Sequence, residues 1–173
     1  YPVWTTNKRQ VLYSSREGIL EFCNAFEMVS QILLKLNDKL FIQVAEEYLP
    51  RATALFTECY EKWHEKDSKL DVFLRKYSPT GMYLRAIHEC LTALEKLKKY
   101  QEFVNLVLNL LISQTVYGLN FRGHWYVRSV LICHSHLKNP DMAIEVCKIG
   151  LEDYRVRGGN RLEIFTRLLK MVK

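Results

Sequence analysis

The chain has 173 residues, 49% of them hydrophobic, and a formal net charge of +6 at neutral pH. This is enough for a buried core in one domain or two closely packed halves, and excludes a small disulfide-stapled scaffold. The long apolar run at 103–112 is interrupted by Asn105 and Asn109 and is too short to cross a bilayer. We expect a fragment of a larger protein, since the chain opens at Tyr1 with neither a methionine nor a signal peptide.

The cysteines are odd in number and widely spaced, with no Cys-x-x-Cys pair that would suggest zinc or redox chemistry. Each stands among apolar residues at helical spacing. The pattern predicts buried thiols in a reducing compartment. The five residues are Cys23, Cys59, Cys90, Cys133 and Cys147.

The positive charge is concentrated toward the C-terminus. From Arg122 onward there are ten Lys or Arg and five acidic residues, whereas the rest of the chain holds fifteen and fourteen. This distribution favours a domain that presents one face to a polyanion. A basic surface that only aids solubility is the alternative.

The first third of the chain predicts an extended lead-in followed by a long helix. Residues 1–13 are rich in β-branched residues, and a basic pair, Lys8 and Arg9, lies within them. Ser14 and Glu17 have the spacing of a capping box. Apolar residues over 19–36 then recur at helical spacing and predict one broad buried face.

The next elements are set by breaks in the pattern. Asn37-Asp38 is expected to end the first helix and cap the second, and Pro50 to kink or restart that second helix. Ser78-Pro79-Thr80-Gly81 reads as a break. We therefore expect residues 1–77 to form an N-terminal helical bundle, and 78–173 a region of repeats.

Two segments beyond that break repeat each other. Residues 82–90 align with 125–133 at an offset of 43, and residues 97–104 align with 137–144 at an offset of 40. The difference of three is close to one helical turn, so the first repeat should have a leading helix one turn longer. A helix-turn-helix unit of this length is typical of tetratricopeptide-like arrays.

The fold class we predict is all-α, with tetratricopeptide-like hairpins stacked as a short right-handed array of two or three pairs. The repeats are expected at about 82–116 and 123–153. A C-terminal capping helix over 160–172 would begin at Asn160, which stands at capping-box spacing from Glu163.

Pro140-Asp141 has two interpretations, a helix start or the opening of a metal-nuclease motif, which also begins with Pro-Asp. Here Asn139 precedes it, the surrounding pattern is helical, and no Glu-x-Lys follows at a strand-like position. Helices usually start with a cap residue, followed by Pro at the first helical position and an acid in the first turn. We therefore interpret Pro140-Asp141 as a helix start.

The sequence shows no catalytic or metal-binding motif of its own. It lacks a Gly-rich phosphate loop, zinc-ligand spacing and a carboxylate cluster for two-metal catalysis. His134 and His136 are two residues apart, so on a helix they diverge and cannot share one metal. We expect no catalysis and no cofactor within this chain.

The stretch 117–128 combines a turn signal, a helix start and basic side chains. Gly118 and Gly123 favour a turn, and apolar residues at helical spacing follow from Trp125. The first amides of a helix lack intrahelical partners and its dipole end is positive, so Arg and His there can bind an anion. Trp125 and Tyr126 have two readings, stacking on a frayed base or packing in the core.

Several segments carry a resemblance to a known family. They are Arg122-Gly123-His124-Trp125-Tyr126-x-Arg128, His134-Ser135-His136-Leu137-Lys138, Ala143-Ile144-x-x-Cys147-x-x-Gly150-Leu151 and Gly159-Asn160-Arg161-Leu162, with weaker matches at Tyr1-Pro2-x-Trp4-Thr5 and Leu12-Tyr13-x-x-Arg16. The series resembles the helical repeat region of the Fanconi-associated nuclease family, which typically shows R-G-R-W-W-x-R-L, H-x-H-L-K, G-L and G-H-R-L-x-L-Y.

The resemblance implies a nuclear, multidomain enzyme that cuts DNA near 5′ ends and flaps in interstrand crosslink repair. Its divalent metal, Mg or Mn, would lie in a separate C-terminal virus-type replication-repair nuclease domain. The implied partners are DNA with a 5′ flap or nick and the other domains of the same nuclease. A homodimer on DNA is a further implied arrangement, and no membrane is involved.

In that family the helical region braces the nuclease and DNA-binding domains and contributes a basic pocket for the 5′-terminal phosphate. Members use an Arg just before the Trp and a His in G-H-R-L; the matching positions here are His124 and Asn160. His is only partly charged near neutral pH and Asn is uncharged, so the pocket would be weaker or moved. Arg122, Arg128 and Arg161 are the remaining candidate cations.

The sequence is compatible with two other functions. Tetratricopeptide-like arrays commonly bind peptides in a groove, and a basic face would then meet acidic partner segments. The other alternative is an internal brace with no ligand, whose basic face is covered by another domain.

Overall fold

The computed structural model describes residues 11–13 and 15–172, and within these ranges it contains helices and no strand. The predicted lead-in, with Lys8 and Arg9, falls almost wholly outside them. The α-helices are α1 (Arg16–Asn37), α2 (Phe41–Gln43), α3 (Leu49–Ser68), α4 (Pro79–Lys96), α5 (Tyr100–Leu106), α6 (Arg122–Leu131), α7 (Pro140–Glu152) and α8 (Gly158–Val172). Three π-helical turns, Val44–Tyr48, Val107–Leu111 and Ile132–His136, continue α2 into α3 and extend α5 and α6.

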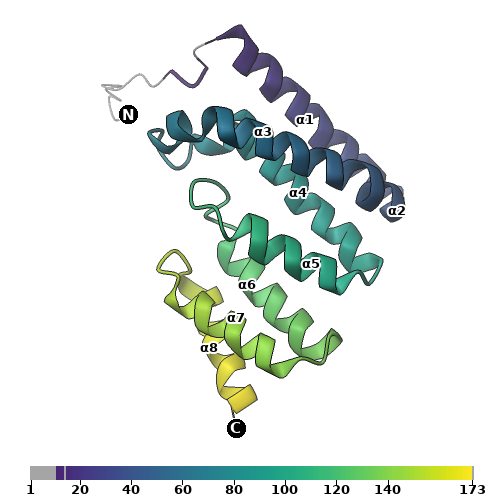
Figure 1. The fold of residues 1–173 in the computed structure, drawn as a ribbon, viewed down its shortest axis with the longest axis vertical. Helices are drawn as coiled ribbons and strands as arrows, with labels where there is room; N and C mark the ends of the chain where they lie inside the picture. The colour runs from purple at the N-terminus through teal and green to yellow at the C-terminus, as the bar shows by residue number, and fades with distance from the viewer. Residues whose placement is uncertain (1–10, 14, 173) are drawn as a thin grey trace, which may run out of the picture.

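The helices form a stack of hairpins (Figure 1). α1 pairs with the α2–α3 rod, α4 with α5, and α6 with α7, and α8 closes the series. α4 packs against both α1 and α3, and α8 packs against both α6 and α7. One hydrophobic core runs through the hairpins.

The lengths of the leading helices agree with the difference between the two sequence offsets. α4 has 18 residues, whereas the 10 residues of α6 and the 5 of its π-helical turn make 15. The first repeat therefore has a leading helix three residues longer, as the two sequence offsets predict.

Each turn within a hairpin has a lysine in the left-handed region of backbone space. These are Lys39, Lys98 and Lys138, with φ of 61°, 58° and 50°. At the first two turns the next amide, from Leu40 or Lys99, donates to a carbonyl five residues back at 2.9 Å. This is the helix-ending motif whose left-handed position is usually glycine. A lysine there costs about 1 kcal/mol in backbone strain.

Helix starts follow the predicted chemistry at two sites and shift at others. Asn139 caps α7 by accepting from the Met142 amide at 3.0 Å, so Pro140-Asp141 is a helix start. Ser78 caps α4 from the Gly81 amide at 3.1 Å, and the expected break is a helix beginning at Pro79.

Three other helix-start predictions were wrong in position. The α1 cap is Ser15, which accepts from Gly18, rather than Ser14, which lies outside the described residues. Asp38 ends α1 as its C-cap residue, as predicted, but it does not cap the second rod, which begins after Leu40 with no side-chain cap. Asn160 lies inside the first turn of α8, not before it.

Pro50 neither breaks nor restarts the second rod. The π-helical turn Val44–Tyr48 precedes it, and the Leu49 amide donates to the Val44 carbonyl. An inserted residue of this kind widens one turn, so the chain absorbs the missing proline donor without leaving the helical path.

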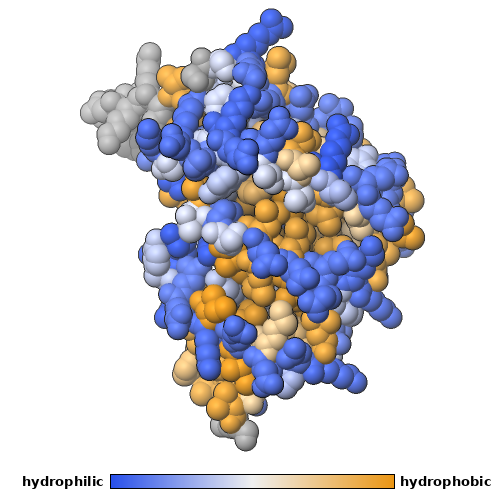
Figure 2. All heavy atoms as spheres, viewed as in Figure 1, coloured by the Kyte–Doolittle hydropathy of each residue, from blue (hydrophilic) through white to orange (hydrophobic). Residues whose placement is uncertain are grey.

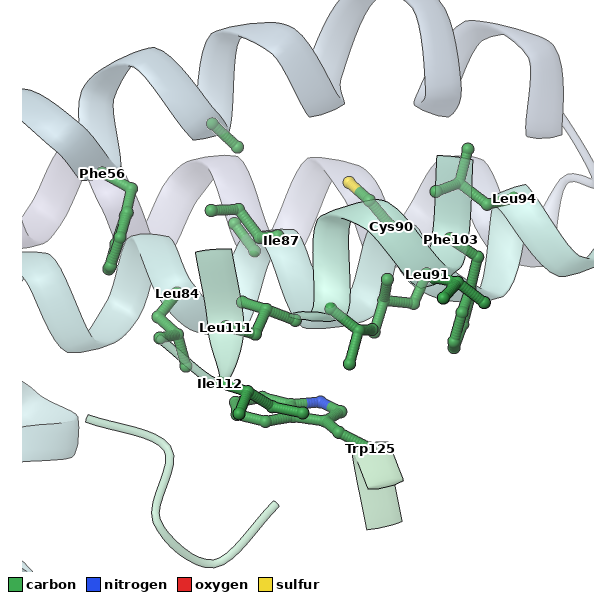
Figure 3. Packing of buried hydrophobic residues seen from close by; sticks show 14 of the residues in the cluster. Phe56, Leu84, Ile87, Cys90, Leu91, Leu94, Phe103, Leu111, Ile112 and Trp125 are labelled. Atoms are coloured by element: carbon green, nitrogen blue, oxygen red, sulfur yellow. The ribbon is translucent and has the colours of Figure 1, made fainter. Parts of the chain in front are cut away.

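The largest core residue is Trp125, which is fully buried, and Tyr126 beside it is 1% exposed. Figure 3 shows Trp125 facing the buried side chains of α4 and α5. Both aromatic residues belong to the core and cannot stack on a base. Of the cysteines, Cys59, Cys90, Cys133 and Cys147 are buried, whereas Cys23 is exposed on α1 and corrects the prediction for that residue.

The two end helices bury only some of their apolar residues. On α1, Ile19, Leu20, Phe26 and Leu34 are exposed, and on α8 Leu162, Phe165, Leu169 and Val172 are between 47 and 68% exposed. Figure 2 shows hydrophobic residues gathered at the α8 end of the array. No helix in the described ranges is long and apolar enough to span a membrane.

Gly81 should be intolerant of any side chain. A Cβ there would lie 2.1 Å from the Arg75 backbone carbonyl oxygen, which is held by the turn before α4. We expect Gly81→Ala to lower the free energy of unfolding by about 2–3 kcal/mol in urea denaturation. Gly159→Ala is the control, because nothing lies within 4 Å of that position; it should be neutral or slightly stabilising.

Candidate functional site

The turn that leads into α6 is held by buried polar contacts. The Gln114 side-chain oxygen accepts from the Val116 and Tyr117 amides at 3.0 and 2.8 Å, and its nitrogen donates to the Tyr117 carbonyl at 2.7 Å. The Tyr117 hydroxyl donates to buried Asp67 at 2.6 Å. Gly118 has φ +61°, and a Cβ there would lie 2.7 Å from Leu84 and from Trp125. The start of α6 is therefore fixed relative to α3 and α4.

Arg122 is 3% exposed, and its guanidinium is taken up by internal partners. Nε and Nη2 donate to Asp153 Oδ2 at 2.7 and 2.6 Å, and Nη1 donates to the carbonyls of Ile112 and Gln114 at 2.9 and 2.8 Å. These contacts join the end of α5, the start of α6 and the loop after α7. Arg122 thus has a structural role and does not present its charge to solvent.

Asp153 stays ionised against this cation. Burial alone would raise its pKa, but hydrogen bonds from the Arg155 amide and the Arg122 guanidinium, with the charges of both arginines, lower the pKa below the ordinary aspartate value. The carboxylate form is therefore the one built into the fold.

Arg128 is also committed within the array. Its Nε and Nη2 donate to the two Glu95 oxygens at 2.7 and 2.6 Å, an arrangement that bridges α6 and α4. The pair is part-exposed, and Glu95 offsets the arginine charge.

The remaining candidates lie where the first turns of α6 and α8 meet. A Cβ on Gly123 would be 2.6 Å from the Asn160 side-chain nitrogen, so Asn160 packs directly on the residue before exposed His124. Arg161 is exposed beside a groove lined by Leu151, Gly158, Leu162 and Phe165. In the described part of the chain, no ion pair involves Arg161.

Two residues on α4, Arg85 and His88, adjoin this region and were missed by the sequence reasoning. The His88 ring stacks on Phe121 with centroids 4.3 Å apart and meets the His124 ring edge at 6.4 Å. Arg85 is half-exposed and only loosely paired with Glu89 at 3.6 Å. The offset of 43 aligns Arg85 with Arg128, and this alignment was the available signal; His88 aligns with an apolar residue and gave none.

The state of His88 is set by its surroundings. The Trp125 indole N–H donates to His88 Nδ1 at 3.0 Å, which requires that nitrogen to be unprotonated. Burial, together with repulsion from His124 and Arg85, lowers the pKa of His88 to about 4. The ring is neutral near pH 7 and carries its proton on Nε2.

Within the described residues, no group of three or more His, Cys, Asp or Glu could hold a metal ion.

A stack of helical hairpins in which α4 and α8 each pack on both helices of the hairpin before them defines a tetratricopeptide-like repeat domain. The model of the Fanconi-associated nuclease 1 TPR domain family matches residues 19–172. The chain therefore belongs to that family.

Similar proteins named Fanconi-associated nuclease 1 include those of Danio rerio, Ailuropoda melanoleuca and Mus musculus. They are 27, 29 and 30% identical to this chain, over 99% of its length. The chain spans 17% of the length of each relative.

The buried ion pair should dominate local stability. Arg122→Ala would leave the Asp153 carboxylate and two carbonyls without their donor, at a cost of about 3–5 kcal/mol in the free energy of unfolding. Arg161→Ala, at an exposed position, should change the free energy of unfolding by no more than about 0.5 kcal/mol.

Because the folded pKa of Asp153 is lowered, the contribution of the Arg122–Asp153 pair to stability is present above the ordinary aspartate pKa of about 3.9 and fades as pH falls below it. Below that pH, the difference in the free energy of unfolding between wild type and Arg122→Ala, measured by urea denaturation, should become smaller.

His88 should titrate near pH 4 in an NMR titration of the folded chain. The folded state then binds fewer protons than the unfolded state between about pH 6.5 and pH 4, so stability should fall as pH drops through that window. His124→Ala removes one repulsive neighbour and should raise the His88 pKa. An ordinary pKa for His88 in the wild type would contradict the role of burial and of the Trp125 contact.

Proposed function

We propose that this chain is the helical, non-catalytic domain of a structure-specific DNA-repair nuclease, a 5′ exonuclease and 5′-flap endonuclease of interstrand crosslink repair. The domain braces the nuclease domain and helps to position DNA near a 5′-terminal phosphate. The names of the relatives support the parent activity, which would use Mg or Mn in another domain and act in the nucleus.

The observation that carries the DNA-positioning role is the meeting of the first turns of α6 and α8. Exposed His124 and Arg161 flank Asn160, so a cation, a titratable ring and an amide donor lie around one corner of the array. Arg85 and the Nε2–H of His88 extend this surface onto α4. Because Arg122 and Arg128 are bound to carboxylates, the phosphate would be held by these other groups.

The bracing role is supported by the exposed apolar faces of the end helices. Terminal repeats that face solvent need polar outer surfaces. The four exposed apolar residues of α8 recur at helical spacing, which is the pattern of a face that packs against another element. We propose that neighbouring domains of the nuclease cover α1 and α8.

A peptide-binding scaffold is the second candidate, and one groove favours it. Leu49, Pro50, Leu94 and Leu106 line a groove between α3 and α5, which continues to Phe56, Tyr60 and Leu110. Figure 2 shows hydrophobic residues gathered along it. Binding there would depend weakly on salt, in contrast to phosphate contacts.

The test is binding to a 5′-flap DNA with and without its terminal phosphate, across a salt series. The phosphate should strengthen binding, and His124→Ala with Arg161→Ala should remove most of that gain, about tenfold or more. Lys148→Ala with Lys170→Ala, both at exposed positions elsewhere, is the matched control.

Equal binding to both DNAs by the wild type would rule out recognition of the phosphate by this chain. The bracing role would then stand alone.

A further inference from the structure

The three turns within the hairpins lie on one edge of the array, at the right in Figure 1, and the connections between hairpins lie on the opposite edge. The turns and flanking helix ends, residues 35–39, 95–99 and 134–139, carry six lysines against two acids. One of these acids, Glu95, is already neutralised by Arg128. One of the lysines, Lys99, lies 3.7 Å from the Glu102 carboxylate. We call this surface the lysine edge; it consists of Lys35, Lys39, Lys96, Lys98, Lys99 and Lys138.

The backbone conformation of Lys39, Lys98 and Lys138 argues that their side chains serve a purpose. Glycine adopts the left-handed region freely, and lysine does so only with strain. All three turns nevertheless use lysine. Strain that recurs at three equivalent positions indicates that the side chains there have a function.

Attraction to the helix C-terminus does not account for this choice. A cation gains that attraction in the last helical turn, where no strained backbone is needed. Lys35 and Lys96 already occupy that position in α1 and α4, and His134 and His136 lie there in the third hairpin. Lys39, Lys98 and Lys138 form no ion pair with any described residue, so their charges face outward.

We propose that the lysine edge binds the phosphate backbone of duplex DNA, at a surface separate from the His124–Asn160–Arg161 corner. Packed helices lie about 8–10 Å apart, so three successive hairpins present a row on the order of 20 Å long. That length follows about six base pairs of one strand. Lysines on a regular spacing suit a backbone of repeated charges and read no sequence. This inference rests on the proposed DNA-acting function of the parent.

The test replaces the three strained lysines together, with Lys39→Gly, Lys98→Gly and Lys138→Gly, in the 173-residue chain. Glycine relieves the backbone, so the triple variant should melt about 3–10 °C higher than wild type. Affinity for a duplex closed by a loop at each end should nevertheless fall by about tenfold or more. The slope of log affinity against log salt should become shallower by about 2–3. A more stable protein that binds less well cannot be explained by misfolding.

Lys69→Gln, Lys148→Gln and Lys170→Gln form the matched control, with the same loss of charge at exposed sites away from the lysine edge. This control should bind nearly as well as wild type. Equal losses in both triple variants would show that only net charge matters, and would overturn the proposal. Absence of wild-type binding at low salt would do the same.

A loss of binding to poly-glutamate with unchanged DNA binding would instead assign the edge to an acidic protein partner. The closed duplex has no 5′ end, so this experiment succeeds or fails independently of the 5′-phosphate test.

Discussion

The buried contact between Arg122 and Asp153 determines how the C-terminal half of the molecule is assembled. From the start of α6, one guanidinium contacts the end of the α5 rod, the turn that follows it and the loop before α8. Two hairpins and the last helix are thereby placed relative to one another, and with them the first turns that carry His124 and Asn160. Arg122, which the sequence pattern associates with ligand binding, instead holds the helices in the positions on which a ligand site would depend.

Much of the fold could be predicted from local chemistry. The offsets of 43 and 40 anticipated the lengths of α4 and α6, and Asn139-Pro140 marked a helix start, because caps and periodicity act over a few residues. The aromatic pair Trp125 and Tyr126 proved to be core. Ser15 in place of Ser14, and the smooth passage through Pro50, could not be predicted, since neighbouring serines are equivalent caps and a π-helical turn has no clear sequence signal.

The candidate site was harder to predict for a physical reason. An arginine that meets a phosphate and one that meets an aspartate look alike in sequence, since both partners are oxygen anions. The carboxylate partners of Arg122 and Arg128 lie 31 and 33 residues away, and only folding shows the pairing. His88 joined the cluster for the same reason, since its neighbours Phe121 and His124 come from the next hairpin.

The exposed apolar faces on α1 and α8 have a consequence for any use of the chain apart from flanking sequence. The two faces lie at opposite ends of the array and differ in shape and composition. Contact between them would be heterologous, so each added copy would leave a free face at both ends and the assembly would not close on itself. A neighbouring domain that covers either face would therefore also stop the growth of such a one-dimensional polymer.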